Sequence, residues 1–259
     1  MTLDEWWLSR VESRFTKLEI EEQFPSEITD VFKASLTKAY FEVQALEDMG
    51  YDACPPIKQT EIDTHNSIVR VYKPPVVGRK YVAYTDPSDG VGDPFVTGVM
   101  DFVTGEVVCS ATGKVKVDEC AKIHDELVRA YNATNSFEYN GNAGGSFSTV
   151  LTALNTPNMS PRYKPDKTVD LEKKGQHISG EFKKAILGHL AFGIAKRQIV
   201  CHDREFMQQA KFVTRDDEGN PLTPKKMDFD WVMMMAGLWW LQQFVPAGEY
   251  GCRSFSYKE

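Results

Sequence analysis

The chain has 259 residues, of which 42% are hydrophobic and 26% charged, an ordinary balance for a soluble globular protein. No apolar run approaches the roughly 18 residues that a membrane-spanning helix needs, so we expect no membrane partner. The five cysteines are odd in number and form no Cys-x-x-Cys pair, which argues against a disulfide framework and against a zinc site. The first residues carry neither a basic patch nor an apolar core, so the sequence indicates a cytosolic protein without a secretory signal.

The net charge of −7 argues mildly against a nucleic-acid partner, because phosphate binding requires Lys and Arg. The charge is unevenly distributed, however. Residues 160–230 hold fourteen Lys and Arg against eleven Asp and Glu. A locally basic region beside a group of carboxylates is typical of sites where metal ions supply much of the positive charge. Nucleic acid therefore remains a candidate partner.

Apolar residues at helical spacing predict two N-terminal helices, Leu3–Phe15 and Ile28–Met49. The pair Pro55-Pro56 ends the second helix, since proline disfavours helix in the residue before it. Residues 57–75 form an irregular connector with one strand candidate, Ile68–Tyr72. We therefore expect residues 1–75 to be a short helical extension plus connector.

From Lys80 onward the pattern changes to short apolar runs separated by tight turns. Three strands are predicted, Tyr81–Asp86, Phe95–Phe102 and Glu106–Ala111, and their short connections imply an antiparallel meander. The predicted elements that follow are helix Asp118–Asn132, strand Asn135–Tyr139, helix Gly144–Leu154, a loop over 155–170, helix Ser179–Ala195, strand Gln198–Cys201, helix Asp203–Lys211, a β-hairpin from Phe212 to Lys226 and the apolar helix Phe229–Phe244. This order predicts an α/β fold, with a mixed sheet flanked by helices on both faces.

Acidic residues stand at the ends of three of these elements. Asp86 ends the first strand of the meander, Glu138 lies near the end of a later strand, and Asp228 and Asp230 open the last helix. Neighbouring strand ends converge at one edge of such a sheet, where ligands bind, and carboxylates on separate elements can hold Mg²⁺. A single Asp at a strand end is more often a turn or cap residue, and Asp228 alone fits an N-cap. The combination, rather than any one member, indicates a metal site.

Three segments, Tyr81–Gly90, Ser136–Asn142 and Asp228–Met234, resemble the nuclease domain of the large terminase subunits of tailed bacteriophages. That family is similar in fold to ribonuclease H and Holliday-junction resolvases, so the resemblance implies a ribonuclease H-like domain over residues 76–259. Lys174–Ser179 resembles the family's Gly-Trp-x-Thr segment, with Gln176 and Ile178 as departures. The start of the chain is similar to the tail of the family's ATPase domain, so the resemblance covers nearly all of it.

The resemblance implies that Asp86 and Glu138 are the first and second metal ligands. In the third motif the family has His-Asp-Asp, where this chain has Asp228, Phe229 and Asp230. Asp230 is then the third ligand and Asp228 an auxiliary one, and the substitution leaves the number of ligands open. Asp93 matches a further acid of the family that acts on or behind the metal, although a simple turn residue is as good an interpretation.

Lys183, Lys184 and His177 are the predicted contacts to DNA phosphate, although a solvated surface position is the more common role for any one of them. The family implies two Mg²⁺ or Mn²⁺ ions, and these catalyse phosphodiester hydrolysis in double-stranded DNA. It also implies action in the host cell cytoplasm, with the terminase ATPase domain, the small terminase subunit and the capsid portal as partners. The segment Thr112–Val115 lacks the glycine and hydroxyl residue of a P-loop, so no ATPase motif is expected in this chain.

Two alternatives stay open at this point. One is a junction resolvase or transposase of the same fold, which would prefer branched DNA. The other is a catalytically weak module that docks on DNA or the portal without cutting, an interpretation favoured by the altered third acidic motif.

Overall fold

The computed structural model describes residues 38–61, 68–164, 166–223 and 229–245. The helix predicted over Leu3–Phe15 and the first part of the one predicted from Ile28 lie outside these residues, as does Asp228. Among the helices described, none is long and apolar enough to cross a membrane.

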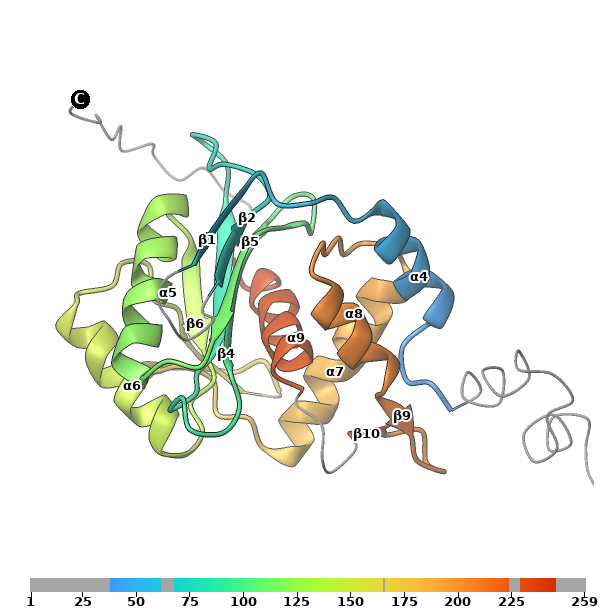
Figure 1. Ribbon diagram of the computed structural model, residues 1–259. Coiled ribbons are helices and arrows are strands. Elements are labelled where there is room, and N and C mark those ends of the chain that lie inside the picture. Colours follow the sequence, from blue (N-terminus) through green and yellow to red (C-terminus); the bar gives the residue numbers. More distant parts are fainter. Residues whose placement is uncertain (1–37, 62–67, 165, 224–228, 246–259) are drawn as a thin grey trace, which may run out of the picture.

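A six-stranded mixed sheet forms the centre of the molecule (Figure 1). Its strands are β1 (Lys58–Glu61), β2 (Ile68–Val71), β3 (Tyr81–Asp86), β4 (Phe95–Asp101), β5 (Val107–Gly113) and β6 (Thr134–Phe137). The order across the sheet is β1-β2-β5-β4-β3-β6. Only β3 and β6 run parallel, and every other neighbouring pair is antiparallel.

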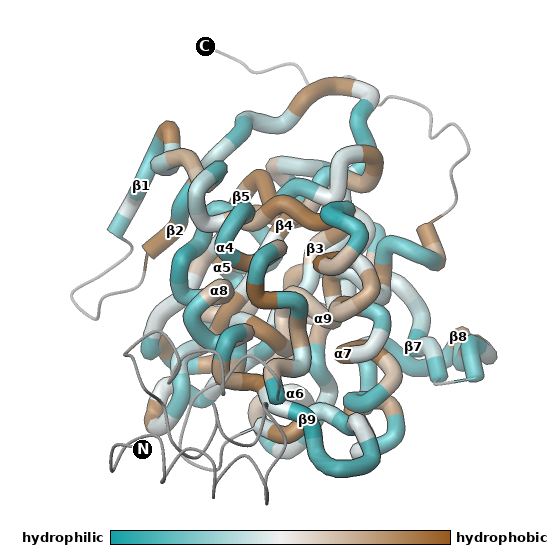
Figure 2. Tube along the Cα trace, turned by 90° about the vertical axis from the view of Figure 1, so that its right-hand side faces the viewer, coloured by the Kyte–Doolittle hydropathy of each residue, from teal (hydrophilic) through white to brown (hydrophobic). Residues whose placement is uncertain are grey.

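Helices cover both faces of the sheet (Figure 1). On one face lie α5 (Val117–Tyr131) and α6 (Gly141–Ala153), and on the other lie α4 (Val43–Asp52), α7 (Gly180–Ala195), α8 (Arg204–Lys211) and α9 (Asp230–Gln242). Two short hairpins complete the described chain, β7 (Pro161–Tyr163) with β8 (Val169–Lys174) and β9 (Thr214–Arg215) with β10 (Pro221–Leu222). The β7–β8 hairpin projects from the body and is largely hydrophilic (Figure 2).

The central strands are continuous apolar runs because both of their faces are covered. In β3, Val82 and Tyr84 belong to the core beneath α9, while Tyr81 and Ala83 belong to the core beneath α5. This alternation is the two-residue period of a β-strand. The same alternation determines the face of the sheet on which the side chain of Asp86, the last residue of β3, lies.

Helix α9 is apolar on all sides because it is enclosed on all sides: every residue from Trp231 to Leu241 is buried, the pattern of a helix in the interior of a protein. It lies directly against the sheet at two glycines. A Cβ at Gly237 would stand 2.3–2.4 Å from ring atoms of Tyr84, and one at Gly98 in β4 would stand 2.6 Å from the sulfur of Met234. The absence of side chains there allows the helix and the sheet to approach closely.

The structure departs from the sequence prediction in four segments. Residues 38–42 are not helical, because Tyr40 N–H donates to Val213 O at 2.8 Å and this segment runs along the β9 region instead. Strand β1 forms in the expected connector, and β2, which confirms the strand predicted at Ile68–Tyr72, joins the central sheet beside β5, so the sheet begins before residue 76. The predicted loop over 155–170 contains β7 and the start of β8, and the predicted strand Gln198–Cys201 is reduced to a single bridge at Val200.

Replacing Gly237 with Ala tests the close contact between α9 and β3. We expect the Gly237→Ala variant to lose about 1–3 kcal/mol in free energy of unfolding, because the new methyl group overlaps the buried Tyr84 ring. Urea unfolding measures this loss. Gly188→Ala in α7 is the matched control, since its Cβ would meet nothing nearer than 3.6 Å and alanine favours helix. Equal stability of the two variants would contradict the packing described.

Candidate active site

The parallel pairing of β3 with β6 brings the first two predicted carboxylates together. Thr85 pairs with Phe137, and Glu138 N–H donates to Thr85 O at 2.9 Å. Asp86 and Glu138 are the next residues along the two strands, so they occupy adjacent positions at the same end of the sheet. Residues far apart in the sequence thus meet because parallel strands end side by side.

The period of the strands also gives these two carboxylates the same face. Phe137 lies in the core beneath α5, and Thr85 contacts His124 of that helix. Successive side chains of a strand alternate between faces. Asp86 and Glu138 therefore lie on the opposite face, the one that α9 covers.

A buried polar network on the α5 face of the sheet stabilises the pairing of β3 with β6. The Asn135 side-chain N–H donates to Pro157 O at 2.7 Å, so Asn135 Oδ1 is the acceptor for His124 Nε2 at 3.2 Å. His124 Nδ1 lies 2.7 Å from the Thr85 hydroxyl oxygen, which is also 2.6 Å from the Thr97 hydroxyl oxygen. Burial lowers the pKa of His124 to about 4, so the imidazole is neutral and holds both strands without adding charge.

Asp230 reaches the same region from α9, of which it is the first residue. A carboxylate in the first turn of a helix is favoured by the helix dipole. Its charge acts on Asp86: burial, then Glu138 and then Asp230 raise the pKa of Asp86 well above its ordinary range. Asp86 therefore lies within electrostatic reach of both Glu138 and Asp230.

The pKa of Glu138 is also raised, to about 7, chiefly because the side chain is desolvated. Lys183 in α7 and a hydrogen bond from Asn140 oppose this shift. The Asn140 amide donates to Glu138 Oε1 at 2.9 Å and to Ile178 O at 3.0 Å, and its own oxygen accepts from Ile178 N–H at 3.1 Å. Asn140 thus fixes the Glu138 carboxylate between β6 and the segment that leads into α7.

This donor set fits a hard divalent cation. Carboxylates forced together in a desolvated place raise one another's pKa values until a positive charge arrives, and oxygen ligands are those that Mg²⁺ and Mn²⁺ prefer. Within the residues that the structure describes, no three His, Cys, Asp or Glu side chains stand close enough together to ligate one ion. The oxygen donors of the site suit a divalent metal ion, but their spacing does not. Binding one ion by all three carboxylates would require them to move closer to each other.

The other predicted site residues are placed less uniformly. Asp93 is exposed in the β3–β4 turn, near enough to raise the pKa of Asp86 slightly. His177 is exposed with Nδ1 3.5 Å from Tyr139 O. The charge of Lys183 lowers the pKa values of Asp86 and Glu138, whereas the charge of the neighbouring Lys184 lowers the pKa of Asp216 in the β9–β10 turn. Of the two lysines, the structure brings only Lys183 to the carboxylates.

Two supporting residues escaped the sequence prediction. Asn140 could have been found from its place two residues after Glu138, but only the fold shows that it binds the carboxylate. Gln176 is buried, and its amide donates to Ser136 Oγ at 3.0 Å while its Oε1 accepts from Tyr163 N–H at 2.8 Å. Its backbone also pairs with Phe137 and Tyr139, so it fastens the outer edge of β6. A glutamine in a polar segment carries no sequence signal for that role.

Known structures share this architecture. The magnesium-bound large terminase nuclease from thermophilic phage G20c is 18% identical to this chain, and the match covers 78% of this chain and 96% of that one with a TM-score of 0.58. The large terminase nuclease domain of Thermus phage P74-26 is 16% identical, with coverage of 82% and 99% and a TM-score of 0.56. No protein-family model and no curated protein matches the sequence.

At these identities the likeness shows the fold. The chain has the ribonuclease H-like mixed sheet flanked by helices that large terminase nuclease domains have. This confirms the fold class and the family resemblance predicted from the sequence.

The raised pKa of Glu138 predicts that, in the absence of metal, ionisation of this carboxyl group lowers the free energy of unfolding as the pH rises. A carboxyl group whose folded pKa lies near 7, above its ordinary 4.5, destabilises the fold progressively as the pH rises through that interval. In a chelator, we expect Glu138→Gln to exceed the wild type by about 1–2 kcal/mol in free energy of unfolding near pH 8, and to lose that advantage near pH 5.

Chemical unfolding at the two pH values measures the difference. Glu172→Gln, at an exposed position of β8, is the control and should show no comparable change between them. A gain in stability of Glu138→Gln that is the same at both pH values would contradict the raised pKa of Glu138.

Proposed function

We propose that this protein is a metal-dependent endonuclease that cleaves double-stranded DNA during the packaging of a viral genome. The observation that carries the proposal is the adjacency of Asp86 and Glu138 at the ends of two parallel strands, with the charge of Asp230, the first residue of α9, raising the pKa of Asp86. The terminase nuclease fold of the chain supports the same function.

In this proposal Asp86, Glu138 and Asp230 hold two Mg²⁺ or Mn²⁺ ions, with Asp93 and Asp228 as auxiliary acids. Such ions activate water for attack on a phosphodiester and stabilise the leaving oxygen. The G20c terminase nuclease, one of the structural neighbours, was crystallised with magnesium.

Side chains of the protein would orient the metal-binding carboxylate and neutralise the charge of the DNA phosphate. Asn140 holds Glu138 in one orientation, so the carboxylate loses little freedom when it binds a cation. Lys183 places a positive charge beside the acids, where it would bind a non-bridging phosphate oxygen of the DNA. His177 and Lys184 would contact the backbone further along the duplex. These contacts involve phosphate rather than bases, so cleavage should show little sequence preference.

The partners in this proposal are double-stranded DNA, the terminase ATPase domain, the small terminase subunit and the capsid portal, and the site of action is the host cell cytoplasm. Of residues 1–75, α4, β1 and β2 pack in this domain, so the link towards the ATPase domain would precede α4. These assignments follow from the family resemblance.

Nicking of supercoiled plasmid in Mn²⁺ tests the nuclease activity. We expect wild-type protein to nick and linearise the plasmid, and Asp86→Ala, Glu138→Ala and Asp230→Ala each to lower the rate by a factor on the order of 100 or more. A chelator should abolish cleavage. Asp216→Ala, an acid of the β9–β10 turn, is the matched control and should cleave like the wild type.

A second pair of variants uses the two adjacent lysines of α7. Lys183→Met should slow cleavage more than Lys184→Met, because the charge of Lys183 lies near the carboxylates and that of Lys184 near Asp216.

Equal cleavage by wild type and Asp86→Ala would reveal a contaminating nuclease, and no cleavage by the wild type would favour the docking module. A strict preference for four-way junctions would favour a resolvase.

A further inference from the structure

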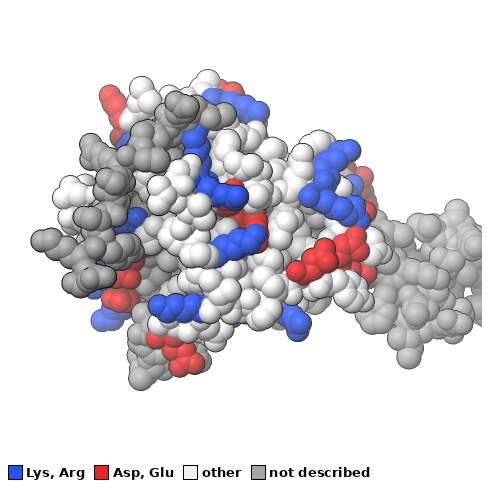
Figure 3. Space-filling view, turned by 90° about the horizontal axis from the view of Figure 1, so that it is seen from above, with Lys and Arg blue, Asp and Glu red and all other residues white. Residues whose placement is uncertain are grey.

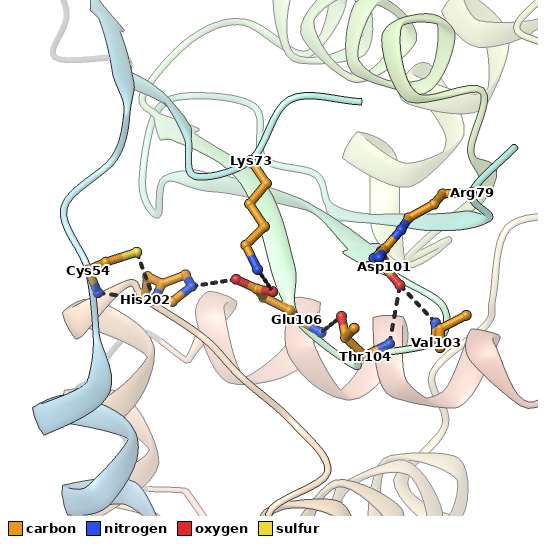
Figure 4. A network of polar contacts seen from close by, with 8 residues as sticks. All are labelled: Cys54, Lys73, Arg79, Asp101, Val103, Thr104, Glu106 and His202. Carbon is orange, nitrogen blue, oxygen red and sulfur yellow. Dashed lines mark hydrogen bonds and ion pairs between the residues drawn. The ribbon is translucent and has the colours of Figure 1, made fainter. Parts of the chain in front are cut away.

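A second group of reactive side chains lies at the opposite end of the sheet from the carboxylates. Cys54 follows α4, His202 precedes α8 and Glu106 directly precedes β5, and the three side chains meet in one line (Figure 4). Seen from this end, acidic side chains occupy the centre of the surface between basic ones (Figure 3). We call Cys54, His202 and Glu106 the thiol triad.

The distances within the thiol triad are those of hydrogen-bonded partners. Cys54 Sγ lies 3.5 Å from His202 Nδ1, and His202 Nε2 lies 3.0 Å from Glu106 Oε1. The other carboxylate oxygen of Glu106 pairs with Lys73. A nucleophile, a base and an acid that orients the base therefore stand in sequence.

The hydrogen bonds determine which nitrogen of His202 carries the proton. Cys54 backbone N–H donates to His202 Nδ1 at 3.2 Å, so Nδ1 is an acceptor and the proton is on Nε2. Nε2–H then donates to Glu106. Burial opposes the charge of Glu106, but hydrogen bonds from Lys73 and His202 outweigh it and hold its pKa below the ordinary value. An ionised Glu106 keeps the lone pair of Nδ1 towards Cys54.

The thiol is also accessible. Cys54 is exposed, whereas Cys109, Cys120 and Cys201 are buried. A cavity of about 510 Å³ opens beside it, and its lining includes Cys54, Pro55, Tyr72, His202 and Gln208.

We propose that Cys54 is a reactive thiol that exchanges with low-molecular-weight disulfides, with His202 as its base and Glu106 as the positioning residue. The Cys54 S–H proton passes to His202 Nδ1, which then no longer accepts the hydrogen bond from the Cys54 backbone N–H, and Sγ attacks one sulfur of the disulfide. The S–S bond of the reagent breaks, and its leaving thiolate takes the proton from Nδ1–H. One disulfide is consumed and one is formed, so the step needs no further oxidant.

The rate of exchange with an aromatic disulfide that releases a coloured thiolate tests this proposal. Peptide mapping of the labelled protein identifies the cysteine that has reacted. We expect Cys54 to react at least about tenfold faster in the native protein than in urea-unfolded protein, and Cys54→Ser to remove the fast phase. His202→Asn should slow it about tenfold or more, and Glu106→Gln should slow it less, since the amide still accepts from Nε2–H.

His189→Asn is the matched control, because His189 stacks on Trp239 and does not contact the thiol triad. It should leave the exchange rate of Cys54 unchanged. Urea unfolding of each variant verifies the fold under the assay conditions. The proposal is overturned if native Cys54 reacts no faster than in the unfolded chain, or if a folded His202→Asn protein exchanges at the wild-type rate.

Discussion

The parallel pairing of β3 with β6 is the constraint on which the candidate site depends. It is the only parallel pair of the six-stranded sheet, and it makes Asp86 and Glu138 neighbours although a strand meander and a helix separate them in the chain. The neutral His124 supports this pairing from the α5 side, and Gln176 fastens the outer edge of β6. Without these supports the two carboxylates, which repel each other, would have little reason to stay together.

The same repulsion links stability to function. Burial raises the pKa values of both Asp86 and Glu138, and the charges of Glu138 and Asp230 raise that of Asp86 further, so the metal-free site opposes folding near neutral pH. The enclosed helix α9 offsets this cost with a continuous buried surface, and the glycine contact at Tyr84 brings Asp230 towards the strand ends. A cation at the site would remove the repulsion, so binding and folding should support each other.

Much of this arrangement could be predicted from the sequence, because it rests on local patterns. The apolar run ending at Asp86 and the all-apolar helix after Asp230 indicate both the elements and the place of the acids at their ends. What failed depends on backbone pairing that the pattern of apolar residues does not reveal. The segment at Tyr40 follows the β9 region because Val213 offers it a carbonyl, β1 forms only because β2 lies beside it, and the β7–β8 hairpin pairs only with itself. Asn140 and the thiol triad likewise acquire their roles only through residues that the fold brings near.

The most direct test of the account is a crystal structure of the protein soaked in manganese, with the metal located by its anomalous scattering. We expect manganese bound by oxygens of Asp86, Glu138 and Asp230 at coordination distances of roughly 2 Å, with Asn140 still holding Glu138. Manganese bound elsewhere, or these carboxylates left apart at a saturating concentration of the metal, would contradict it.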